Sequence, residues 1–160
     1  MGLVIAIAVA NGSVFIYEAR DVLNIASWTE SFEIKTMSAG CNCISWNLAF
    51  DENPMIVVGC QKYEPSQQSI LQKENQDLID ESLLQIYQRR DSAKENAFIP
   101  FFKFKGGHTD TINDVAWAPI AGRSFHIIVS CSKDKSIIVW KIVTKLLVGP
   151  GEFKDSPDVE

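Results

Sequence analysis

The sequence predicts an all-β protein built from a repeated unit, and three observations support that prediction. Three segments of the 160-residue chain align with one another, over residues 5–17, 53–60 and 125–140. Each is rich in Val, Ile, Phe or Tyr alternating with small or polar residues, as half-buried strands require. Turn residues separate these runs, which favours short strands in a repeat architecture over alternating strands and helices.

The repeat pattern divides the chain into three units that together form a partial propeller domain over residues 1–149. We letter the four strands of a blade a to d in chain order. The first unit, 1–36, lacks strand a, and the second, 37–105, is a full blade with an inserted loop at 61–82. The third unit, 106–149, has strands a to c. We expect the remaining residues, 150–160, to form a disordered tail because they lack an apolar period. The expected strands cover residues 4–10, 13–18, 29–34, 42–47, 55–60, 83–88, 98–104, 113–117, 125–131 and 136–142.

The first pair of strands is expected to be joined by a hairpin turn at Asn11-Gly12. These two residues suit a type I′ turn, in which both central residues have φ > 0. A secretory signal peptide is the alternative, because 8–10 reads Ala-Val-Ala like a cleavage site. That alternative needs a positively charged start, and no Lys or Arg precedes Asn11. The sequence therefore favours a hairpin, with 133–135 forming the same corner in the third unit.

The inserted loop at 61–82 is polar and rich in Gln, Glu and Asp, so it is expected to be a mobile surface loop. A short amphipathic helix is an alternative within it, and four apolar residues would mark that helix: Ile70, Leu71, Leu78 and Ile79.

Composition indicates a globular chain with 46% hydrophobic and 22% charged residues. The net charge of −5 argues against nucleic-acid binding, which usually needs a basic patch. No apolar run approaches the ~20 residues of a membrane-spanning helix.

The cysteines are expected to be buried free thiols in a reducing compartment. None of them forms a C-x-x-C pair, and with only two histidines in the chain no zinc spacing is present. Strand alternation would place Cys41 and Cys43 on one face. The four are Cys41, Cys43, Cys60 and Cys131.

One constellation in the third unit has the spacing of a WD-type propeller blade. Gly107-His108 opens the unit, Ser130 lies in strand b, Asp134 in the following turn and Trp140 in strand c. The imidazole is expected to bridge the turn carboxylate and the strand-b hydroxyl, while the indole N–H donates into the same network. A closed network of this kind satisfies polar groups that would otherwise be buried without partners.

The same Ser, His and Asp could also be assigned to a hydrolase triad. The chain has no G-x-S-x-G nucleophile elbow, and the order of the residues matches a blade. The sequence therefore predicts a structural network and no enzyme, with no catalytic, cofactor-binding or metal site.

The other units carry degenerate versions of the network. Asn11 stands where the third unit has Asp134, and Tyr17 and Tyr87 stand where it has Trp140. The remaining correspondences are Ile7 and Gly59 with Ser130, Met37 with His108, and Trp46 with Trp117. These units must rely on strand pairing and apolar packing.

Four stretches resemble the Seh-type WD-repeat nucleoporins of the Sec-thirteen/Seh family: FIYEARDVLNIASW, GCNCISWN, PMIVVG and INDVAWAPIAGRSFHI. The resemblance implies a non-enzymatic scaffold without cofactors, folded as an open, six-bladed propeller. An α-solenoid nucleoporin of the Y-shaped outer-ring subcomplex would donate the missing blade. That location at the nuclear envelope would support transport of protein and mRNA, with no direct nucleic-acid binding and no membrane insertion.

Alternatives within the resemblance are a vesicle-coat subunit and a subunit of a vacuolar or lysosomal TOR-regulating complex. A peptide-binding WD-repeat adaptor is a third possibility. Because the first unit begins within strand b, the chain is expected to be a piece of a larger propeller, marginally stable alone and prone to aggregation.

Overall fold

β-Strands joined by turns and loops make up the described part of the chain, and no helix occurs in those residues. The computed structural model describes residues 3–19, 21, 23–24, 26–36, 38–47, 49, 52–64, 82–92, 95–120 and 122–143. The ten strands are β1 (Val4–Ala8), β2 (Ser13–Ala19), β3 (Trp28–Lys35), β4 (Cys41–Trp46), β5 (Met55–Cys60), β6 (Leu84–Ser92), β7 (Glu95–Phe104), β8 (Ile112–Trp117), β9 (Phe125–Ser132) and β10 (Ile137–Val143).

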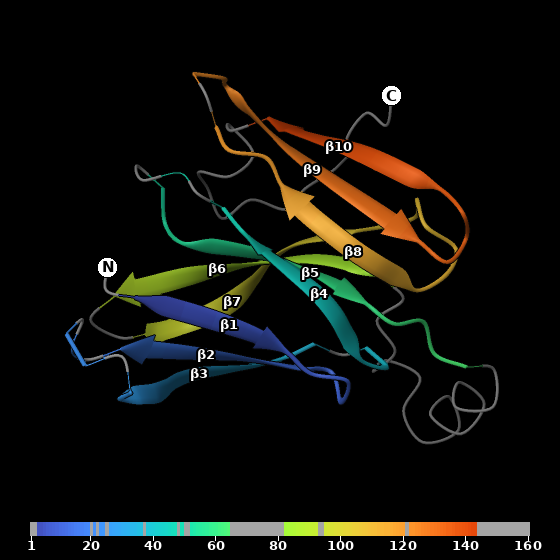
Figure 1. Ribbon diagram of the computed structural model, residues 1–160. Helices are drawn as coiled ribbons and strands as arrows, with labels where there is room; N and C mark the ends of the chain where they lie inside the picture. The colour runs from blue at the N-terminus through green and yellow to red at the C-terminus, as the bar shows by residue number, and fades with distance from the viewer. Residues whose placement is uncertain are drawn as a thin grey trace.

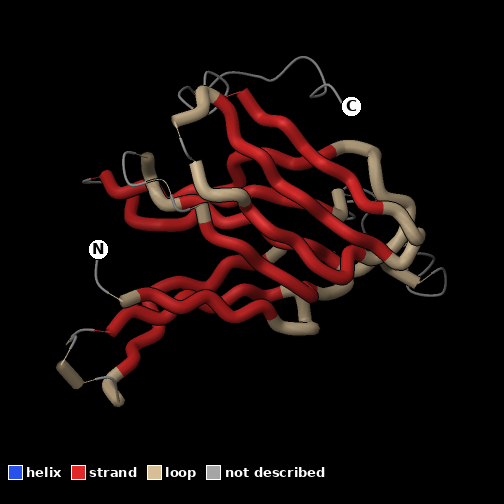
Figure 2. The backbone as a smooth tube through the Cα atoms, turned by 45° about the horizontal axis from the view of Figure 1, so that its top comes forward, coloured by secondary structure: helices blue, strands red, loops and turns tan. Residues whose placement is uncertain are grey.

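The strands form three antiparallel sheets in chain order. The first sheet has the order β1-β2-β3, the second β4-β5-β6-β7, and the third β8-β9-β10. The sheets fan out side by side, with the four-stranded sheet between the two three-stranded ones (Figure 1), and strands dominate the described backbone (Figure 2). The expected fold class, an all-β partial propeller of about two and a half blades, is confirmed.

The middle sheet separates two hydrophobic cores, and β5 contributes to both. All six residues of β5 are buried. Met55 and Val57 pack into the core shared with the third sheet, where Ile112, Ile128 and Trp140 lie. The alternate residues of β5 pack instead into the core shared with the first sheet: Ile56, Val58 and Cys60. A strand covered on both faces explains why 55–60 reads as a continuous apolar run.

The pairing registers establish which residues of the three sheets correspond. Trp46 pairs with Ile56 and Ile56 with Tyr87 in the middle sheet; Trp117 pairs with Ile128 and Ile128 with Trp140 in the third. The expected equivalences of Trp46 with Trp117 and of Tyr87 with Trp140 therefore hold.

The assignment of Gly59 as the counterpart of Ser130 was wrong by one residue. Ser130 lies two residues after Ile128, so its counterpart two residues after Ile56 is Val58. The sequence alignment missed this because the apolar run of Ile56, Val57 and Val58 contains no polar residue that would fix its register against the run at 127–129.

The hairpin between β1 and β2 exists, but the type I′ prediction was wrong. Gly12 has φ +85°, whereas Asn11 is not among the described residues with positive φ. Gly12 N donates to Val9 O at 3.1 Å, and Val9 N donates to Ser13 O at 2.9 Å. The connection is therefore a three-residue loop that places only its last residue in the left-handed region.

The predicted shared face of Cys41 and Cys43 was also wrong. The register shifts between these two residues, so a β-bulge interrupts the strand alternation. Cys41 packs in the core toward the first sheet, and Cys43 packs in the core toward the third. All four cysteines are free, as expected; three are buried and Cys131 is half-buried.

Several expectations fall outside the described residues. These are the body of the inserted loop at 65–81 with its possible helix, Met37, and the tail at 150–160. At the two ends of the loop, Lys62 and Ser82 are described, and Ser82 is buried. Within the described part of the chain, no helix has the length and apolarity needed to cross a membrane.

Candidate functional site

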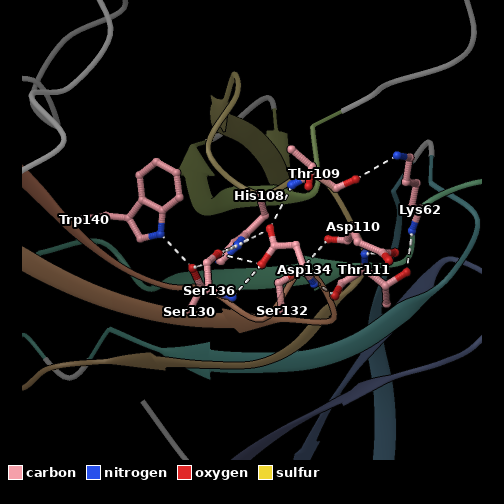
Figure 3. Close-up of polar contacts among 10 residues, drawn as sticks. All are labelled: Lys62, His108, Thr109, Asp110, Thr111, Ser130, Ser132, Asp134, Ser136 and Trp140. Atoms are coloured by element: carbon pink, nitrogen blue, oxygen red, sulfur yellow. Dashed lines mark hydrogen bonds and ion pairs between the residues drawn. The ribbon is translucent and has the colours of Figure 1, made fainter.

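The structure brings together all four members of the constellation in the third sheet (Figure 3). His108 precedes β8, Ser130 lies in β9, Asp134 in the β9–β10 turn and Trp140 in β10. His108 Nδ1 lies 3.0 Å from Asp134 Oδ2, and His108 Nε2 lies 2.8 Å from Ser130 Oγ. Trp140 Nε1 donates to Ser130 Oγ at 2.8 Å.

One assignment of protons satisfies every group in this chain of contacts. The indole N–H of Trp140 can only donate, so Ser130 accepts it and turns its own O–H toward His108 Nε2. His108 then carries its proton on Nδ1 and donates it to the Asp134 carboxylate. The network thus connects the loop before β8 to strands β9 and β10 and to the turn between them.

The Asp134 carboxylate is held ionised by several donors. Ser136 donates to Asp134 Oδ1 from both its backbone N (2.9 Å) and its hydroxyl (2.6 Å). Thr109 N donates to Asp134 Oδ2 at 2.9 Å, beside the His108 contact. The hydrogen bonds from Ser136 contribute most, and together these donors hold the Asp134 pKa well below its usual range.

Gly107 allows His108 to enter the network. Its φ is +87°, and a Cβ atom at this position would lie 2.4 Å from the Cη2 atom of Trp140. The backbone therefore runs directly against the edge of the indole, where only glycine fits. The Phe104 ring also packs against the indole, with its centroid 4.6 Å from that of Trp140.

A second group of bonds holds the loop before β8, residues 109–111, and the sequence did not predict it. Lys62 follows β5; its Nζ donates to Thr109 O at 2.7 Å and its N to Thr111 Oγ1 at 3.1 Å. Ser132 Oγ donates toward Asp110 O and Thr111 O. The Asp-x-Ser spacing of Asp134 and Ser136 signals a side-chain-capped turn, but no spacing signals the contacts of Lys62.

A further buried group lies at the opposite end of β8, also unpredicted. His126 is fully buried; its Nδ1 accepts a hydrogen bond from Trp117 Nε1 at 3.3 Å. His126 Nε2 lies 3.2 Å from Glu52 Oε1, and Asn47 Nδ2 donates to Glu52 Oε2 at 2.7 Å. These contacts connect the third sheet to the segment between β4 and β5.

The other sheets keep only fragments of the network. Asn11 Oδ1 accepts from Ser13 N at 2.9 Å, as Asp134 Oδ1 does from Ser136 N. In the middle sheet Tyr87 donates its hydroxyl to Gln85 Oε1 at 2.6 Å. The degenerate positions therefore retain local turn or strand contacts without the imidazole bridge.

The Ser130, His108 and Asp134 contacts have the order of a catalytic triad, but not its accessibility. Ser130 is 1% exposed, and its oxygen already accepts the Trp140 indole N–H. A nucleophile must reach its substrate, so this arrangement fits a structural role. Among the described residues no group of three or more His, Cys, Asp or Glu is placed to hold a metal ion.

Comparison with known proteins confirms the resemblance to Seh-type nucleoporins. The chain is 34% identical to nucleoporin SEH1 of Homo sapiens over 159 residues, and the match covers 96% of this chain. It is 35% identical over 153 residues to nucleoporin SEH1-A of Xenopus laevis, covering 94% of this chain. The chain spans only 39% of the human relative and 38% of the frog relative. No family model matches it.

Proposed function

We propose that this chain is part of a non-enzymatic scaffold of the nuclear pore outer ring, located at the nuclear envelope. The observation that carries the proposal is the similarity to nucleoporins named SEH1, which extends over 96% of the chain at 34% identity. As a WD-repeat propeller, the scaffold would support transport of protein and mRNA through its place in the pore, with no catalytic step of its own.

The proposed partner is an α-solenoid nucleoporin that supplies strands to the open propeller. In the described part of the chain β1 pairs only with β2, and β10 pairs only with β9. Among the described residues each therefore has a free edge, which is a ready template for strand addition. The exposed apolar residues of these two strands support the same view: Ile5, Ile7, Ile137, Val139 and Val143.

The network of the third sheet serves this proposal as a rigidifying element. A scaffold must hold its blades in one orientation, and His108, Ser130, Asp134 and Trp140 fix four segments of one sheet to one another. Lys62 then connects that sheet to the middle one.

Affinity purification of the tagged chain, followed by mass spectrometry, tests the proposal. We expect recovery of outer-ring α-solenoid nucleoporins. Recovery of vesicle-coat proteins alone, of TOR-regulating subunits alone, or of unrelated signalling peptides would contradict it and favour the corresponding alternative.

A matched pair of substitutions localises the binding. Ile7→Lys places a charge on the free edge strand β1, where Ile7 is 46% exposed, and should reduce nucleoporin recovery. Leu23→Lys changes a residue that is 96% exposed between β2 and β3, and should leave recovery unchanged. Equal loss in both variants would argue against binding through the β1 edge.

A further inference from the structure

Two cysteines face each other across the β4–β5 pair, at the seam between the first and middle sheets. Cys41 is the direct register partner of Cys60. Paired residues of an antiparallel sheet point to the same face, and both thiols lie in the core between these two sheets. Both residues are buried and both are reduced.

The backbone hydrogen bonds show that Cys41 and Cys60 form a non-hydrogen-bonded pair of the two antiparallel strands. Gln61 N donates to Gly40 O at 2.8 Å, while Cys41 N donates to Val9 O and Cys60 N to Leu83 O. The two cysteines therefore do not bond each other's backbone, which is the non-hydrogen-bonded arrangement with Cα atoms about 4.5 Å apart. Disulfides span Cα distances of about 4.4 to 6.8 Å, so the backbone already stands within that range.

The surroundings make the two sulfur atoms chemically unequal. Thr36 Oγ1 lies 3.2 Å from Cys41 Sγ and 2.6 Å from Ser38 Oγ. Hydrogen bonds to Cys41 from the Cys60 thiol, and then from Thr36 and Ser38, lower the pKa of Cys41 to about 7. The shared hydrogen bond with Cys41, together with burial, raises the pKa of Cys60. Such a pair combines a reactive thiolate with an adjacent resolving thiol.

We infer that Cys41 and Cys60 are a peroxide-sensitive redox site that closes to a disulfide across β4 and β5. The Cys41 thiolate attacks one oxygen of hydrogen peroxide; the O–O bond breaks, and the departing hydroxide takes up a proton to leave as water. The resulting Cys41 sulfenic acid is attacked by Cys60, the S–S bond forms, and the S–O bond breaks. The released hydroxide takes the Cys60 proton and leaves as a second water, so two thiols and one peroxide give one disulfide and two waters.

Burial limits the oxidant to a small molecule. Cys41 is 3% exposed and Cys60 fully buried, so hydrogen peroxide is a suitable reagent whereas a bulky disulfide such as oxidised glutathione is not. The other cysteines serve as internal controls. Burial raises the pKa of Cys43 to about 12, and Cys43 packs in the opposite core.

Intact-mass measurement of the full chain after brief exposure to hydrogen peroxide tests the inference. We expect a loss of about 2 Da, the mass of two hydrogens released by one disulfide, with peptide mapping to Cys41 and Cys60. The double variant Cys43→Ser/Cys131→Ser should lose the same mass. No mass loss, or a disulfide between another pair, would overturn the inference.

Two further measurements distinguish oxidation that depends on the folded Cys41–Cys60 pair from unspecific oxidation of cysteines. In Cys60→Ser the resolving thiol is gone, so a sulfenic acid should persist at Cys41. Dimedone should trap it when the oxidised variant is subsequently unfolded, because unfolding exposes the buried sulfur. When the chain is oxidised while unfolded in urea, the preference for a disulfide between Cys41 and Cys60 should disappear. Trapping at Cys43 or Cys131 instead of Cys41, or the same pairing preference in urea, would contradict the inference. These results are independent of whether nucleoporins are recovered.

Discussion

Lys135 occupies, in the turn between β9 and β10, the position that Gly12 occupies between β1 and β2. Gly12 N donates to Val9 O, and Lys135 N donates to Ser132 O. Gly12 has φ +85° and Lys135 has φ +69°, so both turns end in the left-handed region. Glycine adopts this region without penalty, whereas a residue with a Cβ atom is strained there.

Replacing Lys135 by glycine is therefore expected to stabilise the protein. Removing the strained left-handed conformation of a residue with a Cβ atom should stabilise the folded state by about 1–2 kcal/mol. Glycine also makes the unfolded chain more flexible, which offsets about 0.4–1 kcal/mol of that gain. Urea unfolding of Lys135→Gly should show a higher midpoint than the parent chain. Lys133→Gly, in the same turn but without positive φ, should lower the midpoint; equal effects of both substitutions would contradict the interpretation.

Gly107→Ala is expected to destabilise the third sheet by crowding Trp140. The new methyl group would lie 2.4 Å from the indole, so the ring must move, at a cost of about 1–3 kcal/mol for overpacking. A lower unfolding midpoint and a shifted tryptophan emission would report this change.

The neighbouring Gly106 provides a matched control. Its φ is +80°, but nothing lies within 4 Å of an added Cβ atom. Gly106→Ala should therefore show only the backbone penalty of about 1–2 kcal/mol. If both alanine variants lost the same stability, contact with the indole would not explain the glycine at 107.

Ser130 and Trp140 should show energetic coupling in a double-mutant cycle. Ser130→Ala leaves a buried indole N–H and a buried imidazole nitrogen without this partner, at a cost of about 1–3 kcal/mol. Trp140→Phe removes the indole donor. Because the residues share one hydrogen bond, the double variant should lose less stability than the sum of the single variants. Strict additivity in chemical denaturation would show that the bond does not couple them.

The depressed pKa of Asp134 predicts a loss of stability in acid. A carboxylate whose pKa is lower in the folded state contributes stability above its unfolded pKa of about 4. That contribution disappears as the pH falls toward the folded value, because the unfolded chain takes up the proton first.

Asp134→Asn should therefore be less stable than the parent chain at pH 7 and should lose less on acidification to pH 3. The exposed Asp91, whose side chain is 77% accessible, offers a control in Asp91→Asn. Unfolding midpoints at both pH values measure the difference. An acid-induced loss that is the same in the parent chain and Asp134→Asn would contradict the role assigned to Asp134.

The sequence was sufficient to predict the strands because each depends on a local pattern, either an alternation of apolar and polar residues or, in 55–60, a short continuous apolar run bounded by turn residues. The expected 55–60 coincides with β5, and the expected 125–131 differs from β9 by one residue. The grouping of Gly107, His108, Ser130, Asp134 and Trp140 could also be predicted, since their spacing follows the order of one blade.

Features that depend on bulges or on contacts between sheets could not be predicted. A bulge in β4 turns Cys43 away from Cys41. The counterpart of Ser130, which is Val58 and not Gly59, follows only from the strand pairing of Ile56 and Ile128. The bond from Lys62 to Thr109 joins residues 47 positions apart, and no periodicity in either segment indicates it.

Fluorescence localisation of the tagged full chain in the cells that express it tests the central claim most directly, because an outer-ring scaffold must reside at the nuclear pore. We predict a punctate rim at the nuclear envelope that coincides with an outer-ring nucleoporin. Exclusive labelling of vesicles, of the vacuolar or lysosomal surface, or of the cytoplasm would contradict the assignment.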